Sequence, residues 1–361
     1  MKTFLKILFV LLILLVGYAL YVMGSTGFFR SIENTYSGSI IQYDVPGAED
    51  FAIDRDEGFM IISSDDRAAR RDGNTVNSGL YYLNLKEPNA QPKLIKATND
   101  VPLYPHGISM HKIDSGIHRL LVVNHVTASE EAVSSLDPEA KHYIEEYLFK
   151  YDTLTHITSH EGDLVFSPND VVAIDDRRFY FSNDHGSKTK LGLLCEDFLG
   201  FRRSNVVYYD GTDFQKVADD IAYANGINYD AMRNLLYVAS PRDFLVKVYE
   251  VGSDGSLTFE TDIDCNTGVD NIELDERGEI WIGCHPKLLA FSSYAAGSAE
   301  YAPSEVIKID YNSSDDYNVE SVYVSDGTDA SAATTAIPYQ GRLYIGNVMD
   351  GHFIALGLEE L

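Results

Sequence analysis

Six stretches of the chain share one pattern, in which a polar cluster rich in Asp, Asn, Glu or His leads through a turn into a hydrophobic strand. The six copies begin at Ala48, Pro105, Pro168, Ala224, Val269 and Ala333. Their hydrophobic strands centre on Ile61, Val122, Tyr180, Tyr237, Trp281 and Tyr344. Successive centres are therefore 61, 58, 57, 44 and 63 residues apart. A repeat of about fifty residues with four short strands is typical of a β-propeller blade, so the pattern predicts an all-β fold of six blades.

The polar clusters occupy equivalent places in five of the six copies, about 11 to 16 residues before the strand centre. Because blades are arranged radially, equivalent positions converge on the central axis. We therefore expect one set of polar side chains to meet there: Glu49, Asp50, His106, Asn169, Asn225, Asp270 and Asn271.

The predicted propeller spans residues 40–361, where strands alternate with Gly, Asp and Asn turns, and residues 25–39 are a polar linker before it. Two segments interrupt the strands. The first, 127–141, is acidic and rich in Ala, and is expected to be a solvated loop or short helix outside the blades. The second, 188–203, has an apolar face of helical period. A helix there either lines a pocket, contacts a membrane or only covers a hydrophobic patch.

The N-terminus predicts one membrane-spanning helix. No charged residue occurs from Ile7 to Phe29, which is long enough to cross a bilayer. Lys2 and Lys6 precede this segment, so the propeller is expected on the non-cytoplasmic side. No clear small-x-small cleavage site follows the apolar run, so residues 1–24 are expected to be a retained anchor. A cleaved signal peptide is the alternative.

Charge and cysteine content narrow the class of partner. The chain has 55 Asp and Glu against 28 Lys and Arg, a net charge of −27. Nucleic acid is excluded as a partner, because phosphate binding needs concentrated positive charge. Three cysteines do not make a disulfide framework; a bridge between Cys265 and Cys284 is a minor alternative to a buried, unpaired Cys284.

The converging side chains are oxygen donors without cysteine, which suits a hard cation such as Ca²⁺. Carboxylates gathered at an axis would repel one another without such an ion. His106 belongs to the second cluster and His125 ends the next strand, so a strand pair brings both to one mouth of the tunnel as a candidate catalytic pair. His185 and His285 end equivalent strands of two other blades and are expected to face the same mouth.

The ordered motifs resemble those of the paraoxonase and arylesterase family of six-bladed propellers. From Glu49 to the C-terminus the chain carries, in order, ED, PHGIS, LLVVNH, PND, NDH, ANGIN, VDN and WIGCHP. The resemblance implies two calcium ions in a central tunnel. It implies a catalytic Ca²⁺ held by Glu49, Asn169, Asn225, Asp270 and Asn271. It also implies a deeper structural Ca²⁺ held by Asp50, Asp170 and the carbonyl of Ile108.

The resemblance further implies that His106 and His125 form the family's histidine dyad, and we expect His185, His285, Asp184 and Tyr223 to line the substrate pocket. The chain departs from the animal members in lacking the cysteines that close their propeller, so strand pairing alone must close this ring. The insertion after His125 and the DDRAARRDG loop near Asp65 also differ, so substrate preference does not transfer.

The sequence therefore predicts a membrane-anchored, calcium-dependent hydrolase of lactones and aryl esters, with phosphotriesters as promiscuous substrates. Ca²⁺ would polarise the carbonyl, and the histidine pair or Asp270 would activate water. A sugar-lactonase or strictosidine-synthase-like propeller enzyme, and a binding propeller with a structural calcium, are the alternatives.

Overall fold

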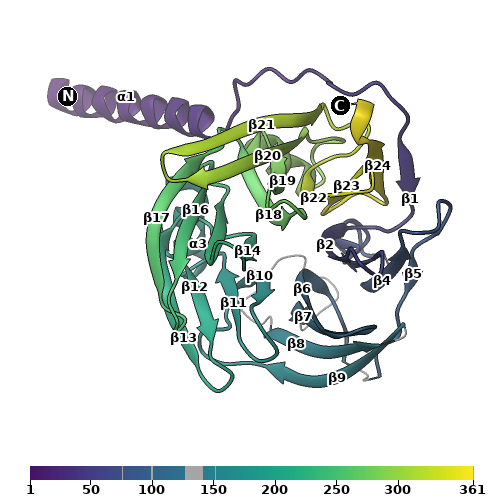
Figure 1. The fold of residues 1–361 in the computed structure, drawn as a ribbon. Helices are drawn as coiled ribbons and strands as arrows, with labels where there is room; N and C mark the ends of the chain where they lie inside the picture. Colours follow the sequence, from purple (N-terminus) through teal and green to yellow (C-terminus); the bar gives the residue numbers. More distant parts are fainter. Residues whose placement is uncertain (75, 99–100, 127–140, 151, 361) are drawn as a thin grey trace.

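The computed structural model describes residues 1–74, 76–98, 101–126, 141–150 and 152–360, and these form six four-stranded antiparallel sheets around one axis (Figure 1). Each sheet is one blade, so the prediction of a six-bladed propeller is confirmed. The six predicted strand centres all lie in the second strand of their blade, next to the innermost one.

The first three blades follow one another along the chain. Blade 1 comprises β2 (Ala48–Asp54), β3 (Phe59–Ser64), β4 (Gly79–Asn84) and β5 (Lys93–Leu94). Blade 2 comprises β6 (Pro105–Asp114), β7 (Ile117–Val126), β8 (Lys141–Lys150) and β9 (Thr153–His160). Blade 3 comprises β10 (Pro168–Ala173), β11 (Phe179–Asn183), β12 (Ser204–Tyr209) and β13 (Phe214–Ile221).

The last three blades complete the ring. Blade 4 comprises β14 (Ile227–Asp230), β15 (Leu235–Ser240), β16 (Leu245–Val251) and β17 (Leu257–Asp264). Blade 5 comprises β18 (Gly268–Leu274), β19 (Ile280–His285), β20 (Ser304–Ser313) and β21 (Asp316–Ser325). Blade 6 comprises β22 (Ala333–Tyr339), β23 (Arg342–Asn347), β24 (Phe353–Gly357) and β1 (Ile41–Tyr43), and a 3₁₀ helix, η1 (Leu358–Glu360), follows it.

Hydrophobic side chains packed between neighbouring blades stabilise the ring. The second strands β3, β15 and β19 are buried along their whole length, because both faces of a blade lie against other blades. Between blades 3 and 4, for example, Tyr180 and Val206 share a core with Ile227 and Val238. The β-branched and aromatic composition of these strands suits such two-sided burial.

Strand pairing closes the ring, as the lack of the family's cysteines predicts. The N-terminal strand β1 pairs with the C-terminal strand β24 through Ile41 and Ala355, Gln42 and Ile354, and Tyr43 and Phe353. The rings of Tyr43 and Phe353 are stacked, with their centroids 4.7 Å apart. Cys265 and Cys284 are both buried and unpaired, so the alternative of a bridge between them is wrong.

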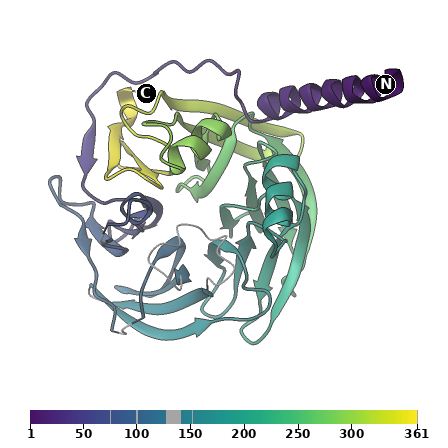
Figure 2. The same ribbon diagram turned by 180° about the vertical axis from the view of Figure 1, so that it is seen from behind.

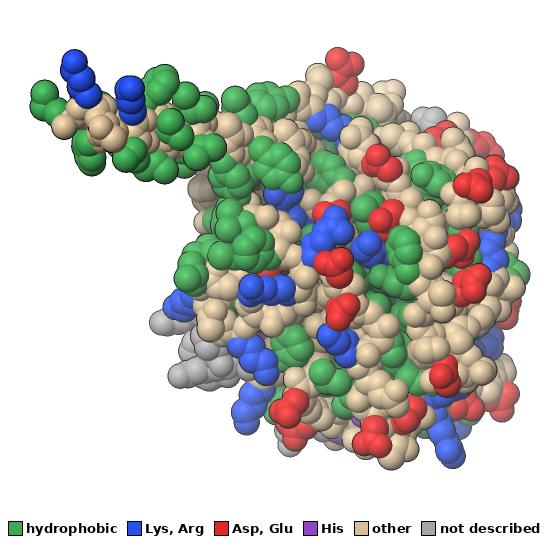
Figure 3. Space-filling model, turned by 90° about the vertical axis from the view of Figure 1, so that its left-hand side faces the viewer, with side chains coloured by type: hydrophobic (Ala, Val, Ile, Leu, Met, Phe, Trp, Pro, Cys, Tyr) green, Lys and Arg blue, Asp and Glu red, His purple; other side chains and the backbone are tan. Residues whose placement is uncertain are grey.

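Four helices contribute to the face of the ring that carries the candidate site, and this face is turned toward the viewer in Figure 2. The N-terminal helix α1 (Lys2–Ser25) stands away from the body with hydrophobic side chains along it (Figure 3). The predicted helix in 188–203 is α3 (Lys190–Leu199), which ends at Gly200 in the left-handed region, with φ of +67°. The sequence analysis did not predict α4 (Leu288–Ala295).

Residues 25–39, the predicted linker, contact the propeller, because Arg30 pairs with Glu305 at 2.6 Å and the backbone amide of Thr35 donates to the carbonyl of Val324. The DDRAARRDG segment is not only a loop, since it contains the short helix α2 (Arg67–Arg71), capped by Asp66. Residues 127–140 of the predicted acidic insertion lie outside the described residues.

Candidate active site

Irregular pairing of the inner strands places the converging side chains. The register between β10 and β11 shifts from Pro168 to Val171, where Asn169 and Asp170 lie, and β18 shifts in the same way from Val269 to Ile272. Comparable shifts occur in β2 and β6. Bulges of this kind bend a strand and re-aim its side chains. Two consecutive polar residues of one strand can therefore point into different parts of the tunnel, where two separate cavities lie.

Four buried oxygen atoms at the axis have no hydrogen-bond partner within the part of the chain that the structure describes. Their residues are each 1–7% exposed. They are Oδ1 of Asn169, Asn225, Asp270 and Asn271. A buried polar atom without a partner is unfavourable, so these oxygens need a ligand. Amide and carboxylate oxygens are the donors that Ca²⁺ prefers, and the donor set therefore fits the predicted catalytic ion.

Glu49 completes this set from blade 1. Its backbone carbonyl accepts hydrogen bonds from Asn271 Nδ2 at 3.1 Å and from Thr334 Oγ1 at 2.7 Å, which tie blades 5 and 6 to blade 1. Burial would raise the pKa of its carboxyl, but His106 and Arg67 outweigh burial and lower that pKa. Among the described residues no three His, Cys, Asp or Glu side chains form a metal-binding group, because this set consists mainly of amides.

The two predicted catalytic histidines are in contact. His106 Nδ1 lies 3.0 Å from His125 Nε2, and His106 Nε2 lies 2.7 Å from Glu49 Oε1. His125 Nδ1 in turn lies 2.8 Å from Nδ1 of His142. The pKa of His125 is well below its ordinary value because of burial, reinforced by the neighbouring His106 and His142. The contact with His142 was not predicted, because it depends on the pairing of β7 with β8.

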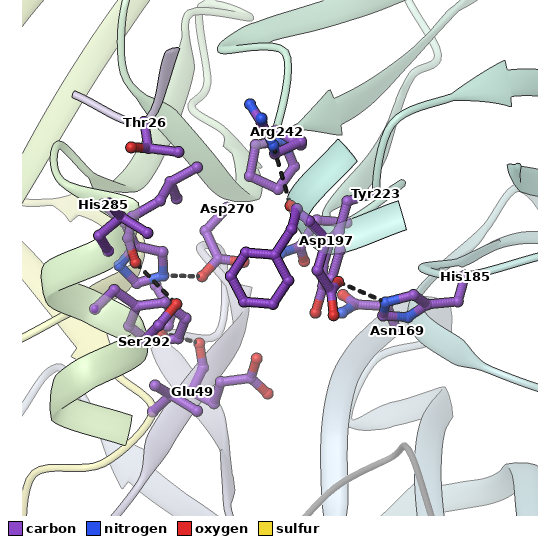
Figure 4. A pocket seen from close by; sticks show the side chains of 18 of the residues that line it. Thr26, Glu49, Asn169, His185, Asp197, Tyr223, Arg242, Asp270, His285 and Ser292 are labelled. Atoms are coloured by element: carbon purple, nitrogen blue, oxygen red, sulfur yellow. Dashed lines mark hydrogen bonds and ion pairs between the residues drawn. The ribbon is translucent and has the colours of Figure 1, made fainter. Parts of the chain in front are cut away.

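An upper cavity of about 350 Å³ brings several of these groups together. Figure 4 shows Asp270 and His285 on one side of it and Asp197 and His185 on the other. Polar residues at its base are Glu49, His106, Asn169, Asn225 and Asp270, and apolar residues around its mouth are Val22, Phe198, Leu288, Leu289 and Phe291. All four helices, α1 to α4, contribute to the lining.

The predicted pocket residues lie beside this cavity. His285 and Tyr223 line it, and His285 Nε2 lies 2.8 Å from Asp270 Oδ2. His185 also lines it and contacts Asp184 at 2.8 Å and Asp197 at 2.9 Å. Burial would lower the pKa of His185, but the two carboxylates outweigh burial and raise that pKa to about 10. Asp184 does not line the cavity and acts through His185.

A second, lower cavity of about 250 Å³ is lined by Asp50, Ile108, Asp170 and Glu273. Asp50 Oδ2 accepts from the amide of Ile108 at 2.7 Å, and Asp170 Oδ2 accepts from the amide of Ile227 at 2.7 Å. Burial and the neighbouring Asp170 and Glu273 raise the pKa of Asp50 well above its ordinary value. A cation would relieve this repulsion, so the residues fit the predicted deeper ion. The role of the Ile108 carbonyl stays a prediction.

Several residues that form these cavities were not predicted. Arg67, Asp197, Arg242 and Thr334 line or border the upper cavity, and Glu273 lines the lower one. Glu273 lies two positions after Asn271, the last residue of the VDN motif, in the same strand. This spacing could have identified Glu273 from the sequence. The positions of Asp197 and Arg242 at the cavity depend on where α3 packs, which the sequence does not show.

The comparisons with known proteins decide the family. The arylesterase family model matches residues 68–355. The serum paraoxonase/arylesterase 1 of Homo sapiens is 34% identical over 297 residues, which cover 76% of this chain and 79% of that protein. This chain belongs to the paraoxonase/arylesterase family. It is therefore a hydrolase of the arylesterase/paraoxonase type.

Other similarities agree with this assignment. The serum paraoxonase/arylesterase 2 of Gallus gallus is 33% identical over 273 residues, covering 74% of this chain and 73% of that protein. Among solved structures, a luciferin-regenerating enzyme matches with a TM-score of 0.53 at 12% identity, over 88% of this chain and 92% of that one. A gluconolactonase of Xanthomonas campestris matches with a TM-score of 0.52 at 13% identity, over 91% and 95% of the two chains. These last two similarities show the propeller fold alone.

Proposed function

We propose that this paraoxonase/arylesterase relative is a calcium-dependent hydrolase of lactones and aryl esters whose reaction takes place in the upper cavity. The observation that carries the proposal is the set of four unpartnered oxygens, three of which (those of Asn169, Asn225 and Asp270) belong to residues that line this cavity together with His106. Together with Glu49 they would hold the ion. A Ca²⁺ bound there would act as a Lewis acid on the carbonyl oxygen of the ester.

The histidines would supply the proton chemistry. His106 lines the cavity, and His125 lies behind it, buried and in hydrogen-bond contact. A neutral imidazole is suited to take a proton from the attacking water and to return one to the leaving alcohol. The low pKa of His125 keeps this second ring neutral at physiological pH, because burial disfavours its charged form.

The apolar mouth of the cavity supports a preference for lactones with an apolar tail. Phe198 on α3 and Leu288, Leu289 and Phe291 at α4 form this mouth, while the polar groups lie at the base. An ester or lactone group at the base would leave an attached alkyl or aryl group among these side chains.

Helix α1 supports membrane anchoring. It is the one helix among the described residues that is long and apolar enough to cross a membrane, with a mean hydropathy of 2.6. Lys2 and Lys6 at its start favour a cytoplasmic N-terminus, which would place the propeller on the non-cytoplasmic side. Its last turn reaches the cavity through Val22, so the substrate entrance would lie close to the membrane surface.

Hydrolysis of γ- and δ-lactones and phenyl acetate, measured with calcium and after EGTA treatment, tests the proposal. Calcium removal should abolish turnover and lower the melting temperature, and calcium should restore both. His106→Gln should lower turnover on the order of 10²-fold or more, since a positioned general base contributes at least that factor. No hydrolysis of any substrate by the calcium-loaded protein would reject the proposal.

A further inference from the structure

Blade 2 holds an unbroken chain of three imidazoles that begins in the upper cavity. His106 on β6, His125 on β7 and His142 on β8 come from three consecutive strands, and His125 and His142 are directly paired in the ladder. Nitrogen atoms in successive rings are 3.0 and 2.8 Å apart. The ring planes are tilted by 77° and 82°, so each pair meets through nitrogens at the ring edges and not by stacking.

The hydrogen-bond chemistry of these rings allows two orderly arrangements. A carboxylate only accepts, so His106 Nε2 donates to Glu49 when the protons point inward. Each neutral imidazole has one N–H, so His125 Nε2 then donates to His106 Nδ1, and His142 Nδ1 donates to His125 Nδ1. In the outward arrangement every proton sits on the opposite nitrogen. The two arrangements differ by the transfer of one proton along the chain.

We propose that His142 is a positioning residue that extends the histidine pair into a proton relay between the upper cavity and solvent. As water attacks, its proton passes to His106 Nε2, the His106 Nδ1 proton to His125 Nε2, and the His125 Nδ1 proton to His142 Nδ1. His142 Nε2 then releases a proton to solvent. The reverse sequence delivers a proton from solvent to the leaving alkoxide, so one turnover returns all three rings to their first state.

The surroundings of His142 suit the outer end of such a relay. His125 is buried, whereas His142 is half-buried, and its Nε2 makes no hydrogen bond with the described part of the chain. Burial lowers the pKa of His142, which keeps the ring neutral, while the charge of Asp184 opposes that shift. Asp184 therefore stabilises the transiently protonated His142 ring, while burial ensures that the ring gives the proton up again.

The inference rests on the proposed hydrolase function, and variants of His142 test it in the calcium-loaded full chain. His142→Ala should lower kcat on the order of 10²-fold with KM little changed, because the relay serves proton transfer and not substrate binding. Imidazole added to the buffer should restore turnover in this variant. His142→Gln should show the same loss, since an amide can donate a hydrogen bond to His125 but cannot pass a proton on.

His156→Ala is the matched control, because His156 lies in the same blade on β9 and pairs with Glu145 away from the cavity. It should keep wild-type kcat. An unchanged kcat in His142→Ala would overturn the relay, and so would a lower kcat that imidazole does not restore, since that loss would be structural. If wild-type protein hydrolyses nothing, the proposed function fails and the relay with it; an active wild type with an unaffected variant rejects the relay alone.

A measurement that does not depend on turnover serves if His142→Ala does not fold. Ring-nitrogen chemical shifts from ¹⁵N NMR of calcium-free protein report which nitrogen of each histidine carries the proton. We expect His125 to carry its proton on Nε2 in the wild type and in His142→Gln, and to show both tautomers in His142→Phe. One unchanged tautomer in all three proteins would show that His142 does not influence the pair, and would overturn the proposal.

Discussion

The two cavities of the tunnel are lined by neighbouring residues of the same inner strands, yet their hydrogen bonding differs. In the upper cavity Oδ1 of Asn169 and Oδ1 of Asp270 have no hydrogen-bond partner among the described residues, and helices α1 to α4 contribute to the lining. In the lower cavity Asp50 and Asp170 already accept backbone amides of the next blade. The upper oxygens are therefore available for a ligand, whereas the lower ones also join blade to blade. Adjacent residues of one bulged strand thus have different roles: Asn169 offers a free oxygen to the upper cavity, whereas Asp170 links blade 3 to blade 4.

The lower carboxylates illustrate how a propeller without a covalent closure is held together near its axis. Asp50 links blade 1 to blade 2, and Asp170 links blade 3 to blade 4. Asn228 Nδ2 donates to the carbonyl of Ile272 and links blade 4 to blade 5. Hydrogen bonds to ionised carboxylates are stronger than those between neutral groups, so the links through Asp50 and Asp170, when these are ionised, are worth more than the neutral link through Asn228.

The largest expected effect comes from Asp170→Ala, which removes the acceptor of the Ile227 and Val171 amides. Each buried amide left without a partner costs about 1–3 kcal/mol, so the free energy of unfolding should fall by about 2–6 kcal/mol. Urea unfolding of calcium-free protein measures this change. Asn169→Ala is the control, since Asn169 Oδ1 has no partner to lose. Equal destabilisation by the two variants would remove the distinction between the cavities.

Activity should show the opposite order. Asn169→Ala with saturating calcium should lower kcat on the order of 10²–10³-fold, because the cation that would stabilise the transition-state charge loses a ligand. Asp170→Ala, assayed at a temperature where it is folded, should lose less turnover per folded molecule. Lactone hydrolysis normalised to folded protein by circular dichroism gives the comparison. A greater loss in Asp170→Ala would place the reaction in the lower cavity.

The ion pairs of His185 with Asp184 and Asp197 make a pH-dependent contribution to the stability of the protein. The pKa of His185 is raised to about 10 in the folded protein, against about 6.5 when unfolded. Its contribution is therefore complete below pH 6.5 and is lost as the pH rises through 10. His185→Gln should be less stable than wild type by about 2 kcal/mol at pH 6, and the difference should shrink toward pH 10. A difference that does not depend on pH would contradict the ion pair.

The smallest expected effect belongs to Glu273. Burial and the nearby Asp170 raise the pKa of Glu273 well above its ordinary value, although Arg55 opposes this. A carboxyl whose pKa is raised in the folded protein destabilises the fold as the pH rises above the pKa of the unfolded state, near 4.3. Calcium-free Glu273→Gln should therefore lose less stability than wild type between pH 4.5 and 7 in thermal melts. With calcium bound, wild type and Glu273→Gln should depend on pH to the same extent, because the cation would compensate the negative charge of Glu273.

Much of the fold and of the donor set could be predicted from the sequence. The repeat gave the number of blades, because each blade uses the same alternation of polar cluster and apolar strand. The convergence of Asn169, Asn225 and Asp270 followed from radial symmetry alone. Helix α4 was missed because LLAFSSYA directly follows a buried strand and has no charged residue to mark a helix face.

The chain could not reveal contacts that depend on register or on packing. The contact between His125 and His142 requires that β7 and β8 pair in one particular register across residues 127–140, whose sequence carries no pairing signal. The contact between Asp197 and His185 requires α3 to lie over blade 3, which an amphipathic pattern cannot specify. In both cases the hydrophobic pattern of each segment predicts its own secondary structure but does not decide which other segment it packs against.

The pairing of β1 with β24 fixes the order in which the molecule can be completed. Blade 6 takes its outer strand from residues before blade 1 and its other three strands from residues after blade 5. The ring therefore stays open until β22, β23 and β24 have been made and β24 has paired with β1. Glu49 and Asn271, which meet through a hydrogen bond between blades 1 and 5, belong to opposite sides of this closing blade, so an ion that needs both would be bound only once the ring is complete.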